Sequence, residues 1–264
     1  MTTRPPLSAT VTAVYVGQPR HIGTTRRGPV ESAIAKSLVD RPALALGTTN
    51  LAGDRQADLR VHGGPDKAVY VYPTEHYPTW RAEGFAVEVG GLGENVALAG
   101  VTERDVLLGD VWRWGDARLQ VSQPRSPCYK LALHAGRKDI GPRMIETGRT
   151  GWYLRVLETG TVPTGGEFVL DHRDDGAPSV HDLFSAMFAA DGEADDDVVD
   201  RVLRSPALAD AWRRPLAARR GDARTSGRRP DGGRSDAART DGDRTGGGRT
   251  DADRSDGARS GGGR

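Results

Sequence analysis

The sequence predicts a mainly β fold, an antiparallel barrel or sandwich, followed by a small helical domain and a tail without a core. Over residues 10–171, many short runs of β-branched and aromatic residues are separated by glycine turns, and only two stretches have helical spacing. Over 179–217 the apolar residues change to helical spacing. Arg, Asp, Gly, Thr and Ser dominate the rest of the chain.

Composition excludes several classes of protein. Of the 264 residues, 37 are Lys or Arg and 36 are Asp or Glu, so no net field attracts nucleic acid or an anionic membrane. No apolar run approaches the roughly 18 residues of a membrane span, and the N-terminus lacks the apolar core of a signal peptide. A single cysteine permits no internal disulfide. We expect a cytoplasmic protein with neither a membrane nor a nucleic acid as partner.

The first elements are short. A strand is expected over 9–16, where Val and Thr dominate. Residues 20–30 are predicted to form a loop, and we assign its three arginines to solvent rather than to a bound anion. Two short strands are expected at 32–39 and 44–46, separated by Asp40-Arg41-Pro42.

Two glycine-rich turns follow and supply candidate ligand-binding residues. Over 62–67, Gly63 and Gly64 let backbone N–H groups approach a ligand, while His62 and Lys67 can contact a phosphate or a ring edge. The alternative is a tight turn with no ligand.

The second glycine turn, 90–96, feeds a strand. It matches neither a P-loop nor a dinucleotide fingerprint. Glu94 and Asn95, at the start of that strand, are placed to hydrogen-bond the edge of a heterocycle.

The other elements of the β domain alternate between helix and strand. A helix is expected from about Tyr72, with Pro73 in its first turn, and a second over 138–147, ended by Gly148. Trp112 and Trp114 are one pleat period apart and are predicted to face the core. The remaining strands are expected at 111–114, 117–121, 152–157 and 167–170.

The C-terminal part has three predicted helices. Ser179 caps the first, the second spans 195–203, and Ser205-Pro206 opens the third. The tail cannot bury enough apolar surface to offset its ordering entropy, so we expect disorder there. The predicted organisation is a leader 1–9, a β domain 10–171, a linker 172–178, a three-helix domain 179–217 and a disordered tail 218–264.

Cys128 is the strongest candidate for chemistry. It lies in the stretch 122–130, directly after a predicted strand, and two prolines stiffen the loop around it. Arg125 and Lys130 flank the thiol, and positive charge lowers a cysteine pKa. Its polar neighbours argue against a buried, inert cysteine. The residues predict a reactive nucleophile or a metal ligand and do not choose between them.

Several motifs together resemble one family. The segments 61–68, 72–80, 93–95, 109–110 and 122–130 are similar to the MOSC domain, the type found at the C-terminus of molybdenum cofactor sulfurases. More narrowly, they resemble the YiiM type, in which a three-helix domain follows the barrel. The resemblance covers roughly residues 10–216 and excludes the tail.

The resemblance implies a β-barrel that binds the molybdenum cofactor, with Cys128 as ligand of the metal. It also implies reduction of N-hydroxylated compounds, such as hydroxylamino purines, hydroxylamino pyrimidines and amidoximes, to amines. Electrons would come from a separate flavoprotein or other reductase, since the chain has no flavin or haem signature of its own. The residues that would contact the cofactor are His62, Gly63, Lys67, Glu94, Asn95, Arg125, Ser126 and Lys130.

Three alternatives stay open. The domain carries the cofactor or sulfur without reducing a substrate. It is a metal-free enzyme with a cysteine nucleophile, which needs a histidine base; His134 is near in sequence. It is an interaction module that acts through the tail.

Overall fold

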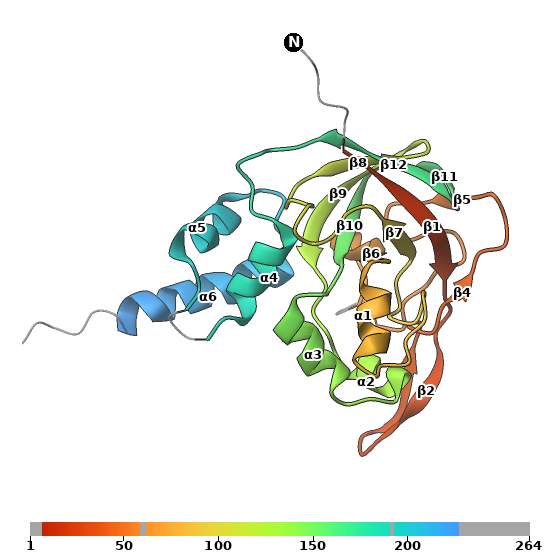
Figure 1. Ribbon diagram of the computed structural model, residues 1–264, viewed down its shortest axis with the longest axis horizontal. Helices are drawn as coiled ribbons and strands as arrows, with labels where there is room; N and C mark the ends of the chain where they lie inside the picture. The colour runs from red at the N-terminus through yellow and green to blue at the C-terminus, as the bar shows by residue number, and fades with distance from the viewer. Residues whose placement is uncertain (1–6, 59–61, 191–192, 227–264) are drawn as a thin grey trace, which may run out of the picture. The chain divides into compact units, whose positions relative to one another are not determined.

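The computed structural model describes residues 7–58, 62–190 and 193–226. Its centre is a closed seven-stranded barrel (Figure 1), in the order β12-β8-β9-β10-β6-β7-β1, with β1 pairing back to β12. All of these pairs are antiparallel except β6 with β7. The strands are β1 (Ser8–Val16), β6 (Val69–Pro73), β7 (Val96–Ala99), β8 (Val111–Trp114), β9 (Ala117–Pro124), β10 (Trp152–Glu158) and β12 (Gly166–His172). The predicted mainly β barrel is confirmed.

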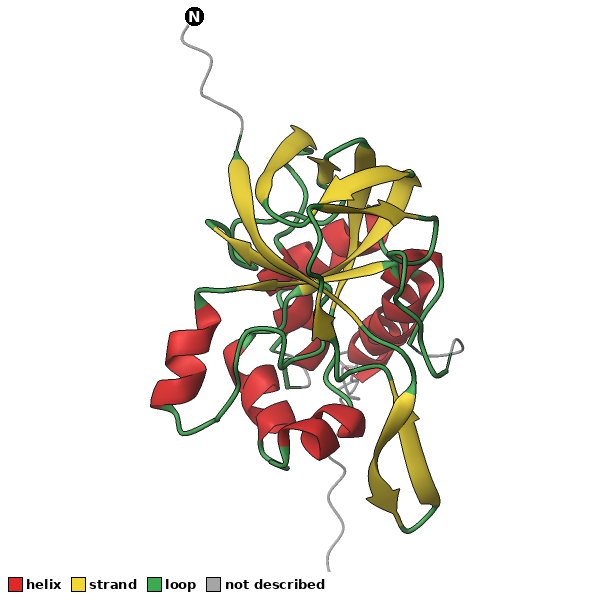
Figure 2. Cartoon of the chain, turned by 90° about the vertical axis from the view of Figure 1, so that its right-hand side faces the viewer, coloured by secondary structure: helices red, strands yellow, loops and turns green. Residues whose placement is uncertain are grey.

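The segment predicted as a loop over 20–30 is instead a hairpin. Its strands are β2 (Arg20–Thr25) and β3 (Gly28–Ser32), joined by Arg26 and Arg27. Threonines favour the pairing, and Gly28 takes a positive φ of 109° after the turn. The hairpin projects away from the barrel (Figure 2).

The strand predicted over 32–39 is reduced to β4 (Ser37–Leu38), which pairs with β1. The strand predicted at 44–46 is β5 (Ala43–Leu46). It pairs with β11 (Gly160–Pro163), a strand that the sequence analysis did not predict.

Three α-helices interrupt the strands of the barrel domain. Helix α1 (His76–Ala82) begins later than predicted, because Pro73 is the last residue of β6. Helix α3 (Ile140–Thr147) ends at Gly148 in a left-handed conformation, as predicted. Helix α2 (Tyr129–Ala135) was not predicted and begins directly after Cys128. A short 3-10 helix, η1 (Pro65–Lys67), follows the first glycine turn.

The barrel interior is filled by large side chains. Trp112 stacks on Phe168 with ring centroids 5.2 Å apart, and Trp114 packs edge-on against the same ring. All three side chains are fully buried, which confirms the core role predicted for the two tryptophans. A second apolar cluster, containing Trp80, Leu131 and other residues, fixes α1, α2 and α3.

Three further helices pack together after the barrel: α4 (Val180–Phe188), α5 (Asp196–Arg204) and α6 (Asp210–Ser226). Ser179 forms the predicted cap, a capping box with Asp182. Helix α6 continues past the predicted boundary at 217, and Arg220 in this extension forms ion pairs with Asp196 and Asp200 of α5.

The predicted tail from 227 onward and residues 1–6 of the leader lie outside the described residues. Within the described ranges, no helix has the length and hydropathy needed to cross a membrane.

Candidate active site

One cavity collects most of the residues proposed from the sequence. It is bounded by strands β6 and β10, the start of α2, and the segments that follow β3 and precede β7. Gly63 and Glu94 are not among its lining residues. The predicted residues that line it are His62, Lys67, Asn95, Arg125, Ser126, Cys128 and Lys130.

Cys128 stands between the end of β9 and the start of α2. Its Sγ lies 3.4 Å from Nε2 of His62, which the first glycine turn carries, and accepts a hydrogen bond from the N–H of Lys130. Burial raises the pKa of the thiol, but the His62 hydrogen bond and the Arg125 charge outweigh burial and lower the pKa from its ordinary 9.0 to about 7. A substantial fraction of the thiol is therefore ionised at neutral pH.

Arg125 is a buried cation beside this thiol, with only 5% of its surface exposed. Its guanidinium lies 5.1 Å from the centroid of the Tyr70 ring, and its Nη1 lies 3.4 Å from the sulfur of Met144. Within the described part of the chain no carboxylate pairs with it. Its charge is balanced in part by the Cys128 thiol when that group is ionised, and a buried cation in a cavity wall suits an anionic ligand.

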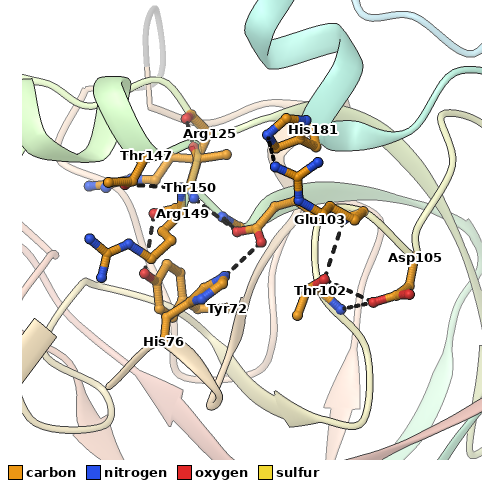
Figure 3. A network of polar contacts seen from close by, with 12 residues as sticks. Tyr72, His76, Thr102, Glu103, Asp105, Arg125, Thr147, Arg149, Thr150 and His181 are labelled. Carbon is orange, nitrogen blue, oxygen red and sulfur yellow. Dashed lines mark hydrogen bonds and ion pairs between the residues drawn. The ribbon is translucent and has the colours of Figure 1, made fainter. Parts of the chain in front are cut away.

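The backbone around Arg125 is held by a polar network centred on the buried Glu103 (Figure 3). Its Oε1 accepts hydrogen bonds from the N–H groups of Thr150 at 2.9 Å and Gly151 at 2.6 Å. Its Oε2 lies 2.7 Å from Nε2 of His76. The Thr150 hydroxyl donates to the Arg125 carbonyl, and the Arg125 N–H donates to the Gly151 carbonyl. Glu103 thereby positions the backbone of Arg125 through the segment 149–151.

Further cations line the cavity. Lys130, in the first turn of α2, is 9% exposed. Burial lowers the pKa of Lys67, against the opposing effect of Asp66. Burial also lowers the pKa of Lys36, against the opposing effect of Asp54, whose Oδ1 lies 2.5 Å from the Lys36 Nζ. The lining is therefore strongly basic around one ionisable thiol.

The structure assigns Glu94 to the protein's own framework instead of the cavity. Its buried carboxylate accepts hydrogen bonds from the Tyr77 hydroxyl and from the N–H groups of Gly90 and Leu92. These contacts shape the second glycine turn and engage both carboxylate oxygens. The ligand contact predicted for Glu94 stays a prediction.

Asn95 does line the cavity, but its amide group is engaged within the protein. Its Oδ1 accepts from the Tyr70 N–H, and its Nδ2 donates to the Asp54 carboxylate at 3.0 Å and to the Tyr15 carbonyl. The amide therefore joins β6, β1 and the segment after β5 at the cavity wall.

Sequence reasoning missed two aromatic residues of the site. Tyr70 and Tyr153 are register partners on β6 and β10 and both line the cavity. Their alternation with Val69 and Leu154, which point into the barrel core, is the signal that could have placed them on the outer face. The histidine beside the thiol is His62, whereas His134 lies on α2 and does not line the cavity.

The matches to known proteins give the family to which this closed barrel, with its basic cavity around one ionisable thiol, belongs. The family model described as MOSC domain matches residues 58–169. Protein YiiM of Escherichia coli (strain K12) is 42% identical over 195 residues, which cover 72% of this chain and 84% of that protein. The chain belongs to the MOSC domain family and, within it, to the YiiM type.

Solved structures agree with this assignment. The crystal structure of YiiM from Geobacillus stearothermophilus matches with a TM-score of 0.66 and 32% identity, over 80% of this chain and 98% of that one.

A protein named reductase from Gibberella moniliformis (strain M3125 / FGSC 7600) is 38% identical over 151 residues, which are 55% of this chain and 27% of that protein.

Proposed function

We propose that the cavity binds the molybdenum cofactor, with the Cys128 thiolate as ligand of the metal. Thiolate is a soft ligand of the kind that such metals accept. Among the residues that the structure describes, no group of three His, Cys, Asp or Glu side chains gathers to hold a bare metal ion. A metal that arrives with ligands of its own, as in a pterin dithiolene, needs only the one thiolate that Cys128 provides.

The charges around the thiol support the same proposal. The single observation that carries it is Arg125, a buried guanidinium without a carboxylate partner in the described part of the chain, beside a thiol whose pKa is lowered to about 7. A dithiolene or a phosphate would add negative charge to this basic cavity. Lys130, Lys67 and Ser126 would contact the same anionic groups from the cavity wall. Among the residues that the structure describes, the buried Nδ1 of His62 has no hydrogen-bond partner, and a ligand atom would satisfy it.

The proposed reaction is the reduction of N-hydroxylated compounds to amines. One N–O bond breaks, two electrons and two protons are taken up, and water leaves. When bound, the cofactor supplies the two-electron chemistry, and a separate flavoprotein or other reductase supplies the electrons. The relative named reductase supports an oxidoreductase role. The protein's own residues bind and orient: Arg125 and Lys130 fix the anionic groups, and Cys128 fixes the metal.

The test is turnover by the molybdenum-loaded full chain. Reduced methyl viologen serves as electron source and benzamidoxime as substrate, with benzamidine measured by chromatography. We expect benzamidine with the wild type and none above background with Cys128→Ser. Full cofactor content and activity in Cys128→Ser would overturn the assignment. A loaded wild type that keeps its cofactor through gel filtration without turnover would support a carrier.

A second function is favoured by one observation. The 3.4 Å contact between Cys128 and His62 is also what a cysteine nucleophile with a histidine base requires. Such an enzyme would work without metal. Turnover that is lost on thiol alkylation, in protein free of molybdenum and pterin, would favour it.

A further inference from the structure

Lysine is rare in this chain and is concentrated at the cavity that contains Cys128. Of the 37 Lys and Arg residues, only four are lysines. Three of them line the cavity, Lys36, Lys67 and Lys130, and the fourth, Lys138, is exposed outside it. Arginine also binds anions well but is not deprotonated in proteins, whereas a buried lysine can release a proton. The use of lysine here favours a role in proton transfer for at least one of the three.

Lys36 is held at one place in the cavity wall. Only 7% of its side chain is exposed, and its Nζ lies 2.5 Å from Oδ1 of Asp54, whose side chain is fully buried. The side chain of Lys36 packs against Gly17, where a Cβ would lie 3.1 Å from Cγ of the lysine and 2.7 Å from the Ala33 carbonyl oxygen. A glycine at position 17 therefore makes room for the lysine.

The carboxylate of Asp54 does not depend on Lys36 alone. Its Oδ1 also accepts a hydrogen bond from the N–H of Gly17 at 2.7 Å, and its Oδ2 accepts one from Nδ2 of Asn95 at 3.0 Å. Hydrogen bonds to a carboxylate stabilise its charge. If Lys36 loses a proton, these two neutral donors still hold Asp54 in place.

The surroundings of Lys36 also ease the release of its proton. Two carboxyl groups face the lysine, Asp54 from the segment after β5 and Glu94 from the turn before β7, and both raise its pKa. Burial acts in the opposite direction and outweighs them, so the pKa of Lys36 lies below its ordinary 10.5. A lysine with a lowered pKa is a better proton donor near neutral pH.

We propose that Lys36 is the proton donor of the site, and that its ammonium group protonates the oxygen that leaves as the substrate N–O bond breaks. This inference rests on the proposed function and adds a catalytic residue to it. The two electrons are those that the separate reductase supplies, the oxygen leaves as water, and the nitrogen takes the second proton from solvent. Lys36 becomes a neutral amine and regains its proton from solvent. Lys67 and Lys130 keep the anion-binding role proposed above.

The first test examines the lysine itself, in cofactor-free full-length protein. Acetic anhydride reacts with neutral amines, and mass spectrometry of peptides measures the labelling of each lysine over a pH series. We expect the labelling midpoint of Lys36 to lie at lower pH than that of the exposed Lys138, because burial lowers the Lys36 pKa. A midpoint at or above that of Lys138 would refute the inference without reference to any activity.

The second test separates proton donation from binding of the cofactor. Lys36→Arg keeps the positive charge but cannot release a proton. In the molybdenum-loaded full chain, with reduced methyl viologen and benzamidoxime, we expect its kcat to fall about 100-fold while KM and molybdenum content stay within about twofold of wild type. Lys36→Ala should lose as much kcat and regain part of it when ethylammonium is added. Lys138→Arg is the matched control and should keep the wild-type kcat.

The outcomes separate this inference from the function on which it rests. A loaded wild type without turnover would refute the proposed function and the role of Lys36 with it. Turnover by loaded Lys36→Arg at the wild-type rate would refute proton donation alone. Loss of molybdenum from both Lys36 variants would make Lys36 a cofactor ligand and would also refute proton donation. A selective loss of kcat, with recovery by ethylammonium in Lys36→Ala only, supports the proposal.

Discussion

Removing the carboxylate of Glu103 tests the network that positions Arg125. Glu103→Ala leaves the N–H groups of Thr150 and Gly151 buried without their acceptor. Each unsatisfied buried group costs about 1–3 kcal/mol, so we predict a loss of about 4 kcal/mol in the free energy of unfolding. Both N–H groups use the same oxygen, Oε1. Glu103→Gln can keep that oxygen and should lose only about 1 kcal/mol.

Urea denaturation followed by tryptophan fluorescence measures both variants. Glu88→Ala is the matched control, because its side chain is 81% exposed and its ion pair with Arg81 spans 3.6 Å. We expect that control to change stability by less than about 0.5 kcal/mol. The reasoning would be refuted if Glu103→Ala were no less stable than Glu103→Gln, since the two backbone hydrogen bonds would then contribute nothing.

Three further predictions concern the thiol, the core and the chain end. In cofactor-free protein, alkylation of Cys128 by iodoacetamide should accelerate as pH rises, with a midpoint near 7, because only the thiolate reacts. His62→Ala should move this midpoint upward through loss of the hydrogen bond, and an unmoved midpoint would exclude that cause. Phe168→Ala, which removes the ring stacked on Trp112, should cost about 3–5 kcal/mol in urea denaturation, and a loss below about 1 kcal/mol would contradict the packing described. Truncation after Ser226 should leave molybdenum content and the thermal midpoint unchanged, whereas a loss of either would assign residues 227–264 a part in the fold or site.

The barrel was predictable because its signals are local. The pleat spacing of Trp112 and Trp114 identified β8, and the strand predicted at 117–121 is the first part of β9, which pairs with β8. The cap at Ser179 was equally readable, since a capping box spans only a few residues. In each case the residues that specify the element lie within or beside it.

The unpredicted elements depend on distant partners. Helix α2 is too short to be stable alone, and it is held because Leu131 packs with Ile140 and Met144 of α3. In α6, Arg220 lies in a charged sequence beyond the predicted boundary and forms ion pairs to Asp196 and Asp200 of α5. Short local patterns cannot reveal such stabilisation.

The residues of the candidate site also fall into those that the local sequence revealed and those that depend on contacts far along the chain. The stretch around Cys128 was recognisable from its composition, and its contact with His62 joins two motifs that the sequence had marked separately. Glu103 carried no signal, because the N–H groups that it binds lie far along the chain, at Thr150 and Gly151. For Glu94, a position at the start of a strand did not reveal which way the side chain turns, and its carboxylate binds N–H groups of the second glycine turn.

The most direct test of the central claim is the molybdenum and pterin content of the purified protein. Wild type and Cys128→Ala are produced in a host that synthesises the cofactor, and molybdenum is measured by mass spectrometry of the metal. We predict near-stoichiometric molybdenum in the wild type and its loss in Cys128→Ala. Equal molybdenum in both, or its absence from both, would contradict ligation by Cys128.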